Sequence, residues 1–573
     1  MAQTKLDGIT TEIIRCYLSS AAEEMRRTLI RTAFHPVIYD VLDFGISIYN
    51  AKTELIAEAA GLPMFIGASD YALKEAVKYV GIENLDPGDI LIMNYPYWNS
   101  AHTQDITLFA PIFDYNNSEL IAFGCIRAHW QDIGAKDPGY VLDSTDMHQE
   151  GIVFPGTKVF KKGEPNHEIL EIIRFNSRMP DFALGDLHAQ VASIRTGERR
   201  LQKIFEKFGK TVIDQAIERI MDHGEKASLQ ALANLPHGTW SAVDYIDDDG
   251  ITDDMIKMMA TVTITEKDFT VDLTGSSNAV KGPVNVPFGA SKSMCRLVFK
   301  AVTTPHLPSN SGNYRPLKVI APPGTLFHAV YPSPTFTLWT TQAGVEVICK
   351  AIAKGNNQIV SAASGGEIPG IQLIGKHPDT GQFFAVSNNE VLGWGGTATH
   401  DGANAVENRS AAAVRNYPVE KIEIGTSSII EKLELCTDSG GPGKFRGGLG
   451  VRRDIQFTAD GEILSVMKKS KTGPWGLAGG HGTEPNGFFI FPGTDREKRV
   501  GTYRAAVTKG DRCYLKSAGG GGYGNPKERD PKLVLEDVLD EYVSIQAARS
   551  IYGVEITDDE INWKETKRLR GEY

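Results

Sequence analysis

The sequence predicts an α+β protein of several domains, with a mixed N-terminal α/β region followed by a half that is rich in strands and glycine. Helical periodicity is concentrated before residue 237, whereas alternating runs and glycine clusters dominate later. With 573 residues, the chain is too long for one ordinary domain. We therefore expect an N-terminal α/β metal-binding region (1–237), a middle α+β domain (238–429) and a β-rich C-terminal domain with a terminal helix (430–573).

The N-terminal region is predicted to open with an amphipathic helix over 8–34, in which apolar residues recur three and four apart. It should end near His35, because the residue before a proline is pushed out of the helical region. A hairpin, a second helix and a strand are then expected at 44–49 with 55–57, 68–80 and 90–93.

Helical periodicity returns at 166–178, 187–208 and 211–235, with breaks at Pro180 and Gly209. Asp186 stands just before the middle segment and is predicted to be its N-cap. Strands predominate beyond residue 238, interrupted by two expected helices and followed by a terminal helical segment: 287–303, 341–354 and 530–551.

Composition and charge argue against two classes of function. Apolar residues make up 41% and charged residues 23% of the chain, as in soluble globular proteins. The net charge of −11 gives no basic surplus for nucleic acid, and no apolar run approaches the roughly 18 residues of a membrane span. Six scattered cysteines and the lack of a signal-peptide pattern are typical of a reducing compartment. We expect a cytoplasmic protein with neither a nucleic-acid nor a membrane partner.

A repeated phrase marks the stretch from 94 to 132. Ala101-His102-Thr103-Gln104-Asp105 returns as Ala128-His129-Trp130-Gln131-Asp132, with two β-like runs and a short polar turn between the copies. An antiparallel hairpin would bring His102 and His129 to the same end. Imidazoles together with a carboxylate are typical ligands of Zn, Mn or Fe.

Further carboxylates are available for such a site. Asp40 and Asp43 lie where the chain leaves a helix and enters a strand, and Asp132 or Asp186 is a candidate to orient a ligand histidine. His35, His148 and His188 are reserve ligands. Because a His beside an Asp is often only a hydrogen-bonded pair, the spacing leaves a purely structural cluster open as an alternative.

The glycine clusters do not predict a nucleotide site. No G-x-x-x-x-G-K-[ST] sequence is present, and Gly519 to Gly522 lead into Tyr523-Gly524-Asn525-Pro526 rather than into a helix. Tight turns that pack close to neighbouring backbone are the expected role of these glycines. No G-x-S-x-G elbow indicates a serine nucleophile.

Short motifs spread along essentially the whole chain point to a known family. In chain order they are Asp43-Phe44, Asn94-Tyr95-Pro96-Tyr97, His102-x-x-Asp105, His129, Asp132-Ile133-Gly134, Gly185-Asp186-Leu187, Ala189-Gln190, Asn416-Tyr417-Pro418-Val419-Glu420, Asp438 to Gly450 and Gly519 to Pro526. Together they resemble the B-type chain of the hydantoinase B/oxoprolinase family. That family includes ATP-dependent hydantoinases and lactamases, the second half of 5-oxoprolinase, and subunits of acetone and acetophenone carboxylases.

The resemblance implies a metal site made of Asp43, His102, Asp105 and His129. Zinc is the metal favoured by the lactamase members, and manganese is the alternative from the carboxylase members. Asp132 and Asp186 are then the candidates for orienting a ligand or for transferring a proton. Many hydantoinase-type members have Gly-Gly-Thr before the first histidine, and the bulkier Trp98-Asn99-Ser100-Ala101 here implies a substrate other than plain hydantoin.

The resemblance also implies a partner. In this family a larger subunit of the hydantoinase A type, with an actin-like ATPase fold, binds ATP and phosphorylates the substrate. ATP is therefore not expected on this chain, and an (αβ)₂ or larger assembly is expected. The predicted function is the metal-binding subunit of an ATP-dependent cyclic amide hydrolase of the hydantoinase, 5-oxoprolinase or lactamase type. The alternatives are a subunit of an ATP-dependent ketone carboxylase and a non-catalytic assembly subunit with a structural metal site.

Overall fold

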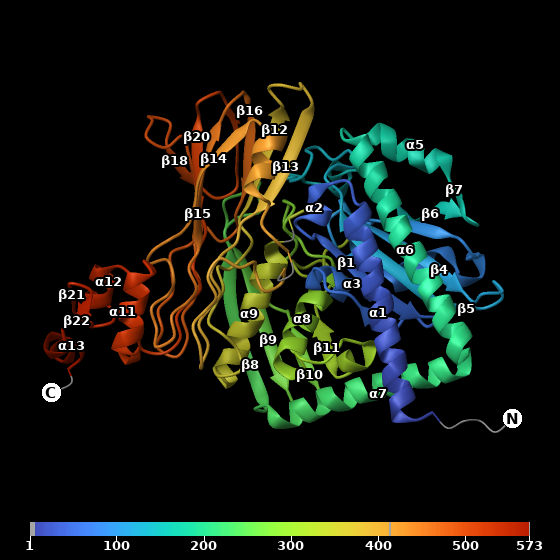
Figure 1. The fold of residues 1–573 in the computed structure, drawn as a ribbon, viewed down its shortest axis with the longest axis horizontal. Helices are drawn as coiled ribbons and strands as arrows, with labels where there is room; N and C mark the ends of the chain where they lie inside the picture. The colour runs from blue at the N-terminus through green and yellow to red at the C-terminus, as the bar shows by residue number, and fades with distance from the viewer. Residues whose placement is uncertain (1–5, 338, 412–413, 572–573) are drawn as a thin grey trace. The chain divides into compact units, whose positions relative to one another are not determined.

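The computed structural model describes residues 6–337, 339–411 and 414–571 (Figure 1). Helices and several β-sheets alternate along the chain, which confirms the predicted α+β class. The chain forms two compact units: the first contains Met1–Thr239 and Thr261–Thr341, and the second contains Trp240–Ala260 and Gln342–Tyr573. The division into three domains expected from the sequence is a statement about which segments fold independently. It stays a prediction.

A seven-stranded antiparallel sheet forms the centre of the first unit. Its order is β2-β1-β5-β4-β3-β6-β7. The bounds are β1 (Phe44–Asn50), β2 (Leu55–Glu58), β3 (Ile90–Met93), β4 (Asp105–Phe113), β5 (Leu120–His129), β6 (Pro155–Lys161) and β7 (Glu164–Pro165). Strands β4 and β5 are the predicted hairpin, and their register pairs Asp105 with His129 at its open end.

Helices cover both faces of this sheet. On one face lie α1 (Gly8–Thr32) and α6 (Pro180–Phe208), which pack against each other (Figure 1). On the other lies α3 (Pro63–Val80), whose Leu73 and Ala76 pack against Phe109 and Phe123 of the hairpin. Since both faces are buried, most strand residues of the hairpin are apolar whichever way they point.

The sequence placed the start of α6 wrongly. The helix begins at Pro180 and not after Asp186, because proline is well tolerated in the first turn, where its missing N–H has no helical partner. Asp186 therefore lies inside the helix and is not its N-cap. Gly209, at φ 78°, separates α6 from α7 (Lys210–Asn234) as expected.

The first unit has several further helices and strands. They are α2 (Pro36–Tyr39), α4 (Pro96–Asn99), α5 (His167–Asn176), α8 (Phe288–Thr303), β10 (Phe269–Asp272), β11 (Leu317–Ile320) and the 3-10 helices η1 (Ile82–Asn84), η2 (Met147–Glu150) and η3 (Ser311–Tyr314). A four-stranded sheet has the order β11-β10-β9-β8, with β8 (Gly238–Ile246) and β9 (Ile256–Ile264) each contributing residues to both units.

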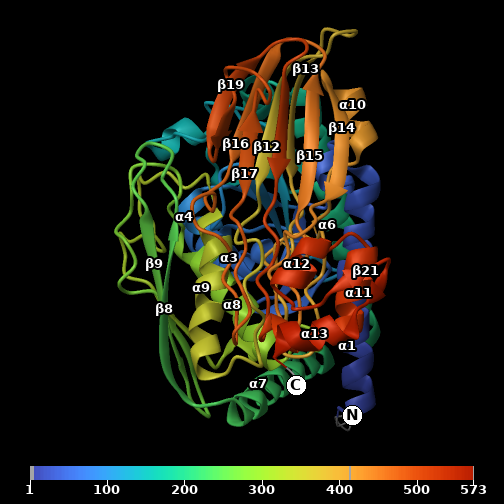
Figure 2. The same ribbon diagram turned by 90° about the vertical axis from the view of Figure 1, so that its left-hand side faces the viewer.

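The second unit is built mainly of strands (Figure 2). One sheet has the order β13-β12-β16-β19, formed by β12 (Gly370–Lys376), β13 (Phe383–Asn389), β16 (Gly461–Val466) and β19 (Tyr503–Val507). The other has the order β14-β15-β20-β17-β18, formed by β14 (Ser428–Leu435), β15 (Val451–Phe457), β17 (Gly487–Ile490), β18 (Lys498–Val500) and β20 (Arg512–Lys516). Its other elements are α9 (Trp339–Gly355, which starts in the first unit), α10 (Val419–Gly425), η4 (Pro526–Glu528), α11 (Pro531–Leu539), α12 (Ile545–Ser550), β21 (Ile556–Thr557), β22 (Glu560–Ile561) and α13 (Trp563–Arg570).

Glycine segments of the second unit pack backbone against backbone. Gly520 N–H donates to Gly448 O at 2.9 Å, and Gly448 N–H donates to Trp394 O at 2.8 Å. A Cβ on Gly448 would lie 1.8 Å from the carbonyl oxygen of Ala403, so there is no room for any side chain at this position. The expectation that these glycines allow close backbone contact is confirmed.

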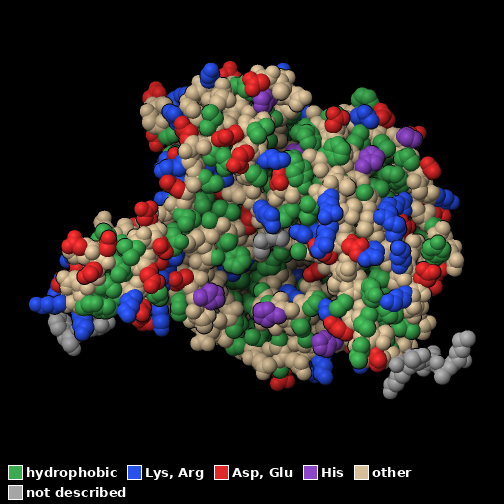
Figure 3. All heavy atoms as spheres, in the orientation of Figure 1, with side chains coloured by type: hydrophobic (Ala, Val, Ile, Leu, Met, Phe, Trp, Pro, Cys, Tyr) green, Lys and Arg blue, Asp and Glu red, His purple; other side chains and the backbone are tan. Residues whose placement is uncertain are grey.

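The exposed side chains on the face drawn in Figure 3 carry interspersed charges of both signs. Within the described ranges, no helix combines the length and apolar character that a bilayer crossing requires.

Candidate metal centre

His102, Asp105 and His129 meet at the open end of the β4–β5 hairpin. Nδ1 of His129 lies 3.1 Å from Oδ1 of Asp105, and Nε2 of His102 lies 3.2 Å from Oδ2 of the same carboxylate. One potential ligand atom from each residue lies within 4.8 Å of the others. The convergence expected from the repeated phrase is therefore confirmed for these three side chains.

The loop that carries His102 and Asp105 is held by buried hydrogen bonds. Asp105 N–H donates to His102 O at 3.0 Å, which closes a turn around Thr103 and Gln104. Asn99 Nδ2 donates to Asp105 O, and Asn94 Nδ2 donates to Thr103 O, each at 2.7 Å. These amide side chains fix the backbone that carries the two ligands.

Asp43 directly precedes β1 and lies beside His129, whose N–H donates to Asp43 O at 3.2 Å. Its Oδ1 is buried and has no hydrogen-bond partner. Burial raises the pKa of the Asp43 carboxyl to about 7. The charge of His129 acts to lower this pKa, and the charge of Asp105 acts to raise it. Asp43 therefore belongs to the same electrostatic cluster.

The polar atoms of this cluster fit a divalent cation. Besides Asp43 Oδ1, the buried atoms His102 Nδ1 and Asp105 Oδ2 have no hydrogen-bond partner, which is costly for a folded protein unless something else occupies the space. Two imidazoles and two carboxylates form a donor set that suits zinc or manganese.

The two histidines differ in their proton affinity. Burial lowers the pKa of His102 to about 4, so this ring is neutral and able to act as a ligand at neutral pH. Burial also acts to lower the pKa of His129, but the hydrogen bond to Asp105 and the charges of Asp43 and Asp105 outweigh it and raise the pKa. A cation is thus favoured beside Asp105, whether it is a proton on His129 or a metal ion.

Asp132 and Asp186 are both engaged in bonds outside the ligand group. Asp132 Oδ1 accepts from Arg178 Nη1 at 2.7 Å and from Gly134 N–H at 3.1 Å. Asp186 Oδ1 accepts from the N–H groups of Phe34 and His35, at 2.7 and 3.1 Å. These contacts hold the segments that flank the centre, and the orienting or proton-transfer roles expected for the two carboxylates stay predictions.

The reserve histidines have other contacts. His35 Nδ1 accepts from Val37 N–H at 3.2 Å and caps α2, while burial and the charge of His129 lower the pKa of His35 to about 3. His148 Nε2 lies 3.2 Å from the Tyr331 hydroxyl, and His188 Nδ1 lies 2.6 Å from Leu184 O on its own helix. His35 is thus a buried neighbour of His129, and the other two are exposed.

The bulky residues around the ligand motif mostly serve packing. The Trp130 side chain is buried, and its Nε1–H donates to Gln190 Oε1 at 2.9 Å. Trp98 packs edge-on against Tyr95. The aromatic ring beside the centre is Phe336, 4.8 Å from the His102 ring between centroids. Sequence spacing offered no signal for Phe336, because it is more than two hundred residues away along the chain.

Two buried polar residues, one just before the hairpin and one within it, were given no role from the sequence. Gln104 is fully buried, and neither its amide nitrogen nor its amide oxygen has a hydrogen-bond partner. Arg127 is also fully buried, within strand β5, which has no other polar side chain before His129 at its end. A charged residue inside such a run is the signal that could have marked Arg127.

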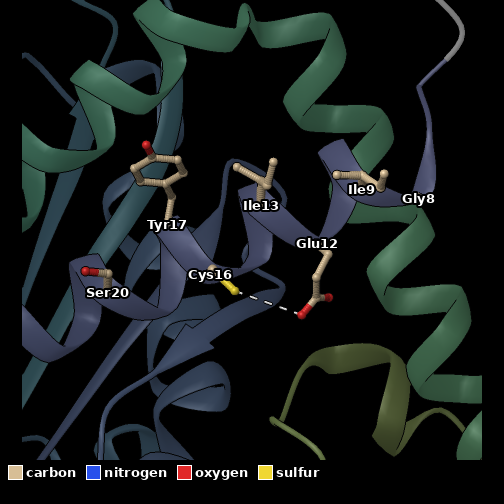
Figure 4. Close-up of a pocket in the computed structure, with 7 residues that line it drawn as sticks. All are labelled: Gly8, Ile9, Glu12, Ile13, Cys16, Tyr17 and Ser20. Carbon is tan, nitrogen blue, oxygen red and sulfur yellow. Dashed lines mark hydrogen bonds between the residues drawn. The ribbon is translucent and has the colours of Figure 1, made fainter.

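A separate open pocket of about 590 Å³ lies along α1 (Figure 4). It is lined by Gly8, Ile9, Glu12, Ile13, Cys16, Tyr17 and Ser20. Glu12 is paired with Arg15, and Oε1 of Glu12 lies 3.9 Å from Cys16 Sγ. This apolar surface brings together no acid–base or metal-ligating group comparable to the hairpin cluster.

We expect Asp186→Asn to change how stability depends on pH. Burial raises the pKa of Asp186 from 3.8 to about 7, although the Phe34 and His35 N–H groups act to lower it. Between these values the folded protein binds more protons than the unfolded chain, so Asp186 makes stability fall as pH rises from about 4 to about 7, by up to about 1.4 kcal/mol per pH unit. Urea unfolding across this range should show a shallower decline for the variant, and parallel profiles would contradict the assignment.

Similarity to known proteins identifies the family. The model of the family described as hydantoinase B/oxoprolinase matches residues 7–526. The chain belongs to this family. A protein from Pseudomonas sp. (strain NS671), provisionally named as the B-type chain of a D-/L-hydantoinase, is 31% identical over 99% of this chain and 98% of its own length. The beta subunit of caprolactamase from Pseudomonas jessenii is 27% identical, with 96% of each chain covered.

Two solved structures have the same fold as this family member. The crystal structure of the ATP-dependent caprolactamase from Pseudomonas jessenii matches with a TM-score of 0.90 at 26% identity, over 99% of this chain and 100% of that one. An acetone carboxylase structure also matches with a TM-score of 0.90, at 18% identity over 99% of this chain and 84% of that one. The second likeness concerns the fold alone. The family and its named relatives support an enzyme subunit of the ATP-dependent lactamase and oxoprolinase type.

Proposed function

We propose that this chain is the metal-binding subunit of an ATP-dependent hydrolase of cyclic amides, of the hydantoinase, 5-oxoprolinase or lactamase type. The observation that carries the proposal is the group of half-buried His102 and buried Asp105 and His129, with the Asp43 carboxylate beside it, whose Oδ1 has no hydrogen-bond partner. Membership of the hydantoinase B/oxoprolinase family supports a catalytic use of this group. Asp43, His102, Asp105 and His129 would hold zinc, or manganese as the alternative.

The residues of the centre divide the chemical work. A divalent ion held there supplies Lewis acidity toward the substrate and an activated water. His102 remains neutral at physiological pH because its pKa is lowered to about 4, and so presents a lone pair. Asp105 Oδ1 is hydrogen-bonded to His129 Nδ1 and orients that ring, while Oδ2 lies 3.2 Å from His102 Nε2. Phe336 lies against the His102 ring and helps to exclude bulk water from it.

The substrate is proposed to arrive already activated. The hydantoinase and caprolactamase relatives are named as subunits, which supports a partner for this chain as well. We assign ATP binding and substrate phosphorylation to a larger actin-like ATPase subunit in an (αβ)₂ or larger assembly. Steady turnover of a lactam by this chain without partner and ATP would contradict this part of the proposal.

Metal analysis of the purified protein is the direct test. We expect about one zinc or manganese per chain in the wild type and loss of that metal in both His102→Ala and His129→Ala, because each removes a buried nitrogen ligand. His188→Ala is the matched control, since its ring is exposed and contacts its own helix. Absence of metal from a folded wild-type protein would refute the metal mechanism.

A ketone carboxylase subunit is the second candidate, favoured by the fold shared with acetone carboxylase. Assays of the complex with ATP separate the two candidates. Ring opening of lactams or hydantoins supports the hydrolase, whereas incorporation of bicarbonate into a ketone supports the carboxylase. A metal-loaded complex that is inactive in both assays would indicate a structural site.

A further inference from the structure

Arg127 is a fully buried cation without a carboxylate partner. Its Nε donates to Thr107 Oγ1 at 2.9 Å, and its Nη2 donates to Asn99 Oδ1 at 3.1 Å and to Asn99 O. Its Nη1 is buried and has no hydrogen-bond partner. Among the residues that the structure describes, Arg127 forms no ion pair, although its guanidinium lies 5.5 Å from the centroid of the Phe65 ring and the charge of Asp105 acts on it. Burying a guanidinium without an ion-pair partner is unfavourable.

Arg127 lies beside the proposed metal centre. In the β4–β5 ladder it is paired with Thr107, and this pair lies two residues along each strand from the pair of Asp105 and His129. Residues two apart on a strand point to the same face of the sheet, so Arg127 and His129 share a face. Asn99, which accepts from Arg127, also donates to Asp105 O.

The net charge of the metal-loaded centre indicates that Arg127 lacks an anionic partner. The proposed ligand set contains two carboxylates, whose formal charge a divalent ion balances. The charge of Arg127 is then left over, so the loaded centre favours an anion. The partnerless Nη1 supplies a hydrogen-bond donor for that anion in the same buried region.

We propose that Arg127 is the anion-recognising residue of this centre and donates through Nη1 to a phosphoryl oxygen of the substrate. The proposal rests on the function proposed above, in which the cyclic amide arrives phosphorylated. A guanidinium suits this task because it stays charged when buried and its N–H groups match phosphate oxygens. Arg127 thus extends the centre from a metal site to a site for phosphate esters or phosphoimidates.

Inorganic phosphate is the probe for the test, with protein loaded with Mn²⁺. Calorimetry gives the affinity, and paramagnetic relaxation of the phosphorus signal in NMR reports whether phosphate lies near the metal. We expect phosphate to bind the wild type close to the metal. Arg127→Met should keep the metal and bind phosphate roughly tenfold or more weakly, because it removes the charge and the donor. Arg127→Lys keeps the positive charge but lacks the planar N–H donors of the guanidinium, so its phosphate affinity should lie between those of the wild type and Arg127→Met.

Arg200→Met is the matched control. Arg200 is an exposed guanidinium on α6 that pairs with Glu24 outside the centre, so phosphate affinity should stay close to that of the wild type. Unchanged phosphate binding in Arg127→Met or, if that variant does not fold, in Arg127→Lys overturns the inference, as does a metal-loaded wild type that binds no phosphate near the ion. Equal loss in Arg200→Met and Arg127→Met also overturns it, because the loss would then not depend on the buried guanidinium. A wild type without metal overturns the proposed function as well, so the two failures are distinguishable.

Discussion

Replacing Asp105 by asparagine is expected to abolish metal binding and turnover together. Asp105 is fully buried, and its two oxygens lie 3.1 and 3.2 Å from ring nitrogens of His129 and His102. The amide keeps the shape but removes the negative charge, and it places a donor where an acceptor is needed. The loss of metal affinity should exceed the roughly 10- to 100-fold that follows from losing an outer partner of a ligand. Metal content after dialysis and activity of the complex with the ATPase partner measure both effects.

Asp114→Asn is the control for this variant on the same hairpin. Asp114 lies at the opposite end, where its exposed carboxylate accepts from Ser118 and Glu119 N–H groups in the turn. Metal content should be unchanged in this control. Retention of a full complement of metal by Asp105→Asn would show that Asp105 is not a ligand.

Gly448→Ala is expected to have the largest effect on stability. The added Cβ would lie 1.8 Å from Ala403 O and close to other backbone atoms, so relief requires main-chain movement rather than a change of rotamer. We expect a loss of more than about 4 kcal/mol, visible as insoluble protein or as a strongly lowered melting temperature. The second unit should be affected first, because all these contacts belong to it.

Gly425→Ala is the matched control in the same unit. Its position at the end of α10 leaves no heavy atom within 4 Å of an added Cβ. The melting temperature should therefore stay near that of the wild type. A soluble Gly448→Ala protein that melts like Gly425→Ala would contradict the close packing of the glycine segments.

The sequence predicts the hairpin and the meeting of its two histidines because a polar turn between β-like runs fixes which ends come together. The lone charge of Arg127 in an apolar run could have marked the residue, but not its position beside the centre, because both faces of a covered sheet are buried and alternation does not tell them apart. The start of α6 was missed because Pro180 suits a first helical turn as well as a break. Phe336 reaches His102 only through tertiary folding, which no local pattern encodes.

The glycine contacts also govern the order in which the chain can acquire its structure. Gly393, Gly448 and Gly520 are linked through direct backbone bonds and short intervening segments, yet they are spread over a long stretch of the polypeptide. None of the hydrogen bonds to Gly520 can form before the ribosome has synthesised the chain as far as residue 520. The β4–β5 hairpin, by contrast, joins neighbours in sequence. We therefore expect the glycine-rich unit to fold more slowly than the hairpin, with its unpaired backbone open to aggregation until these contacts form.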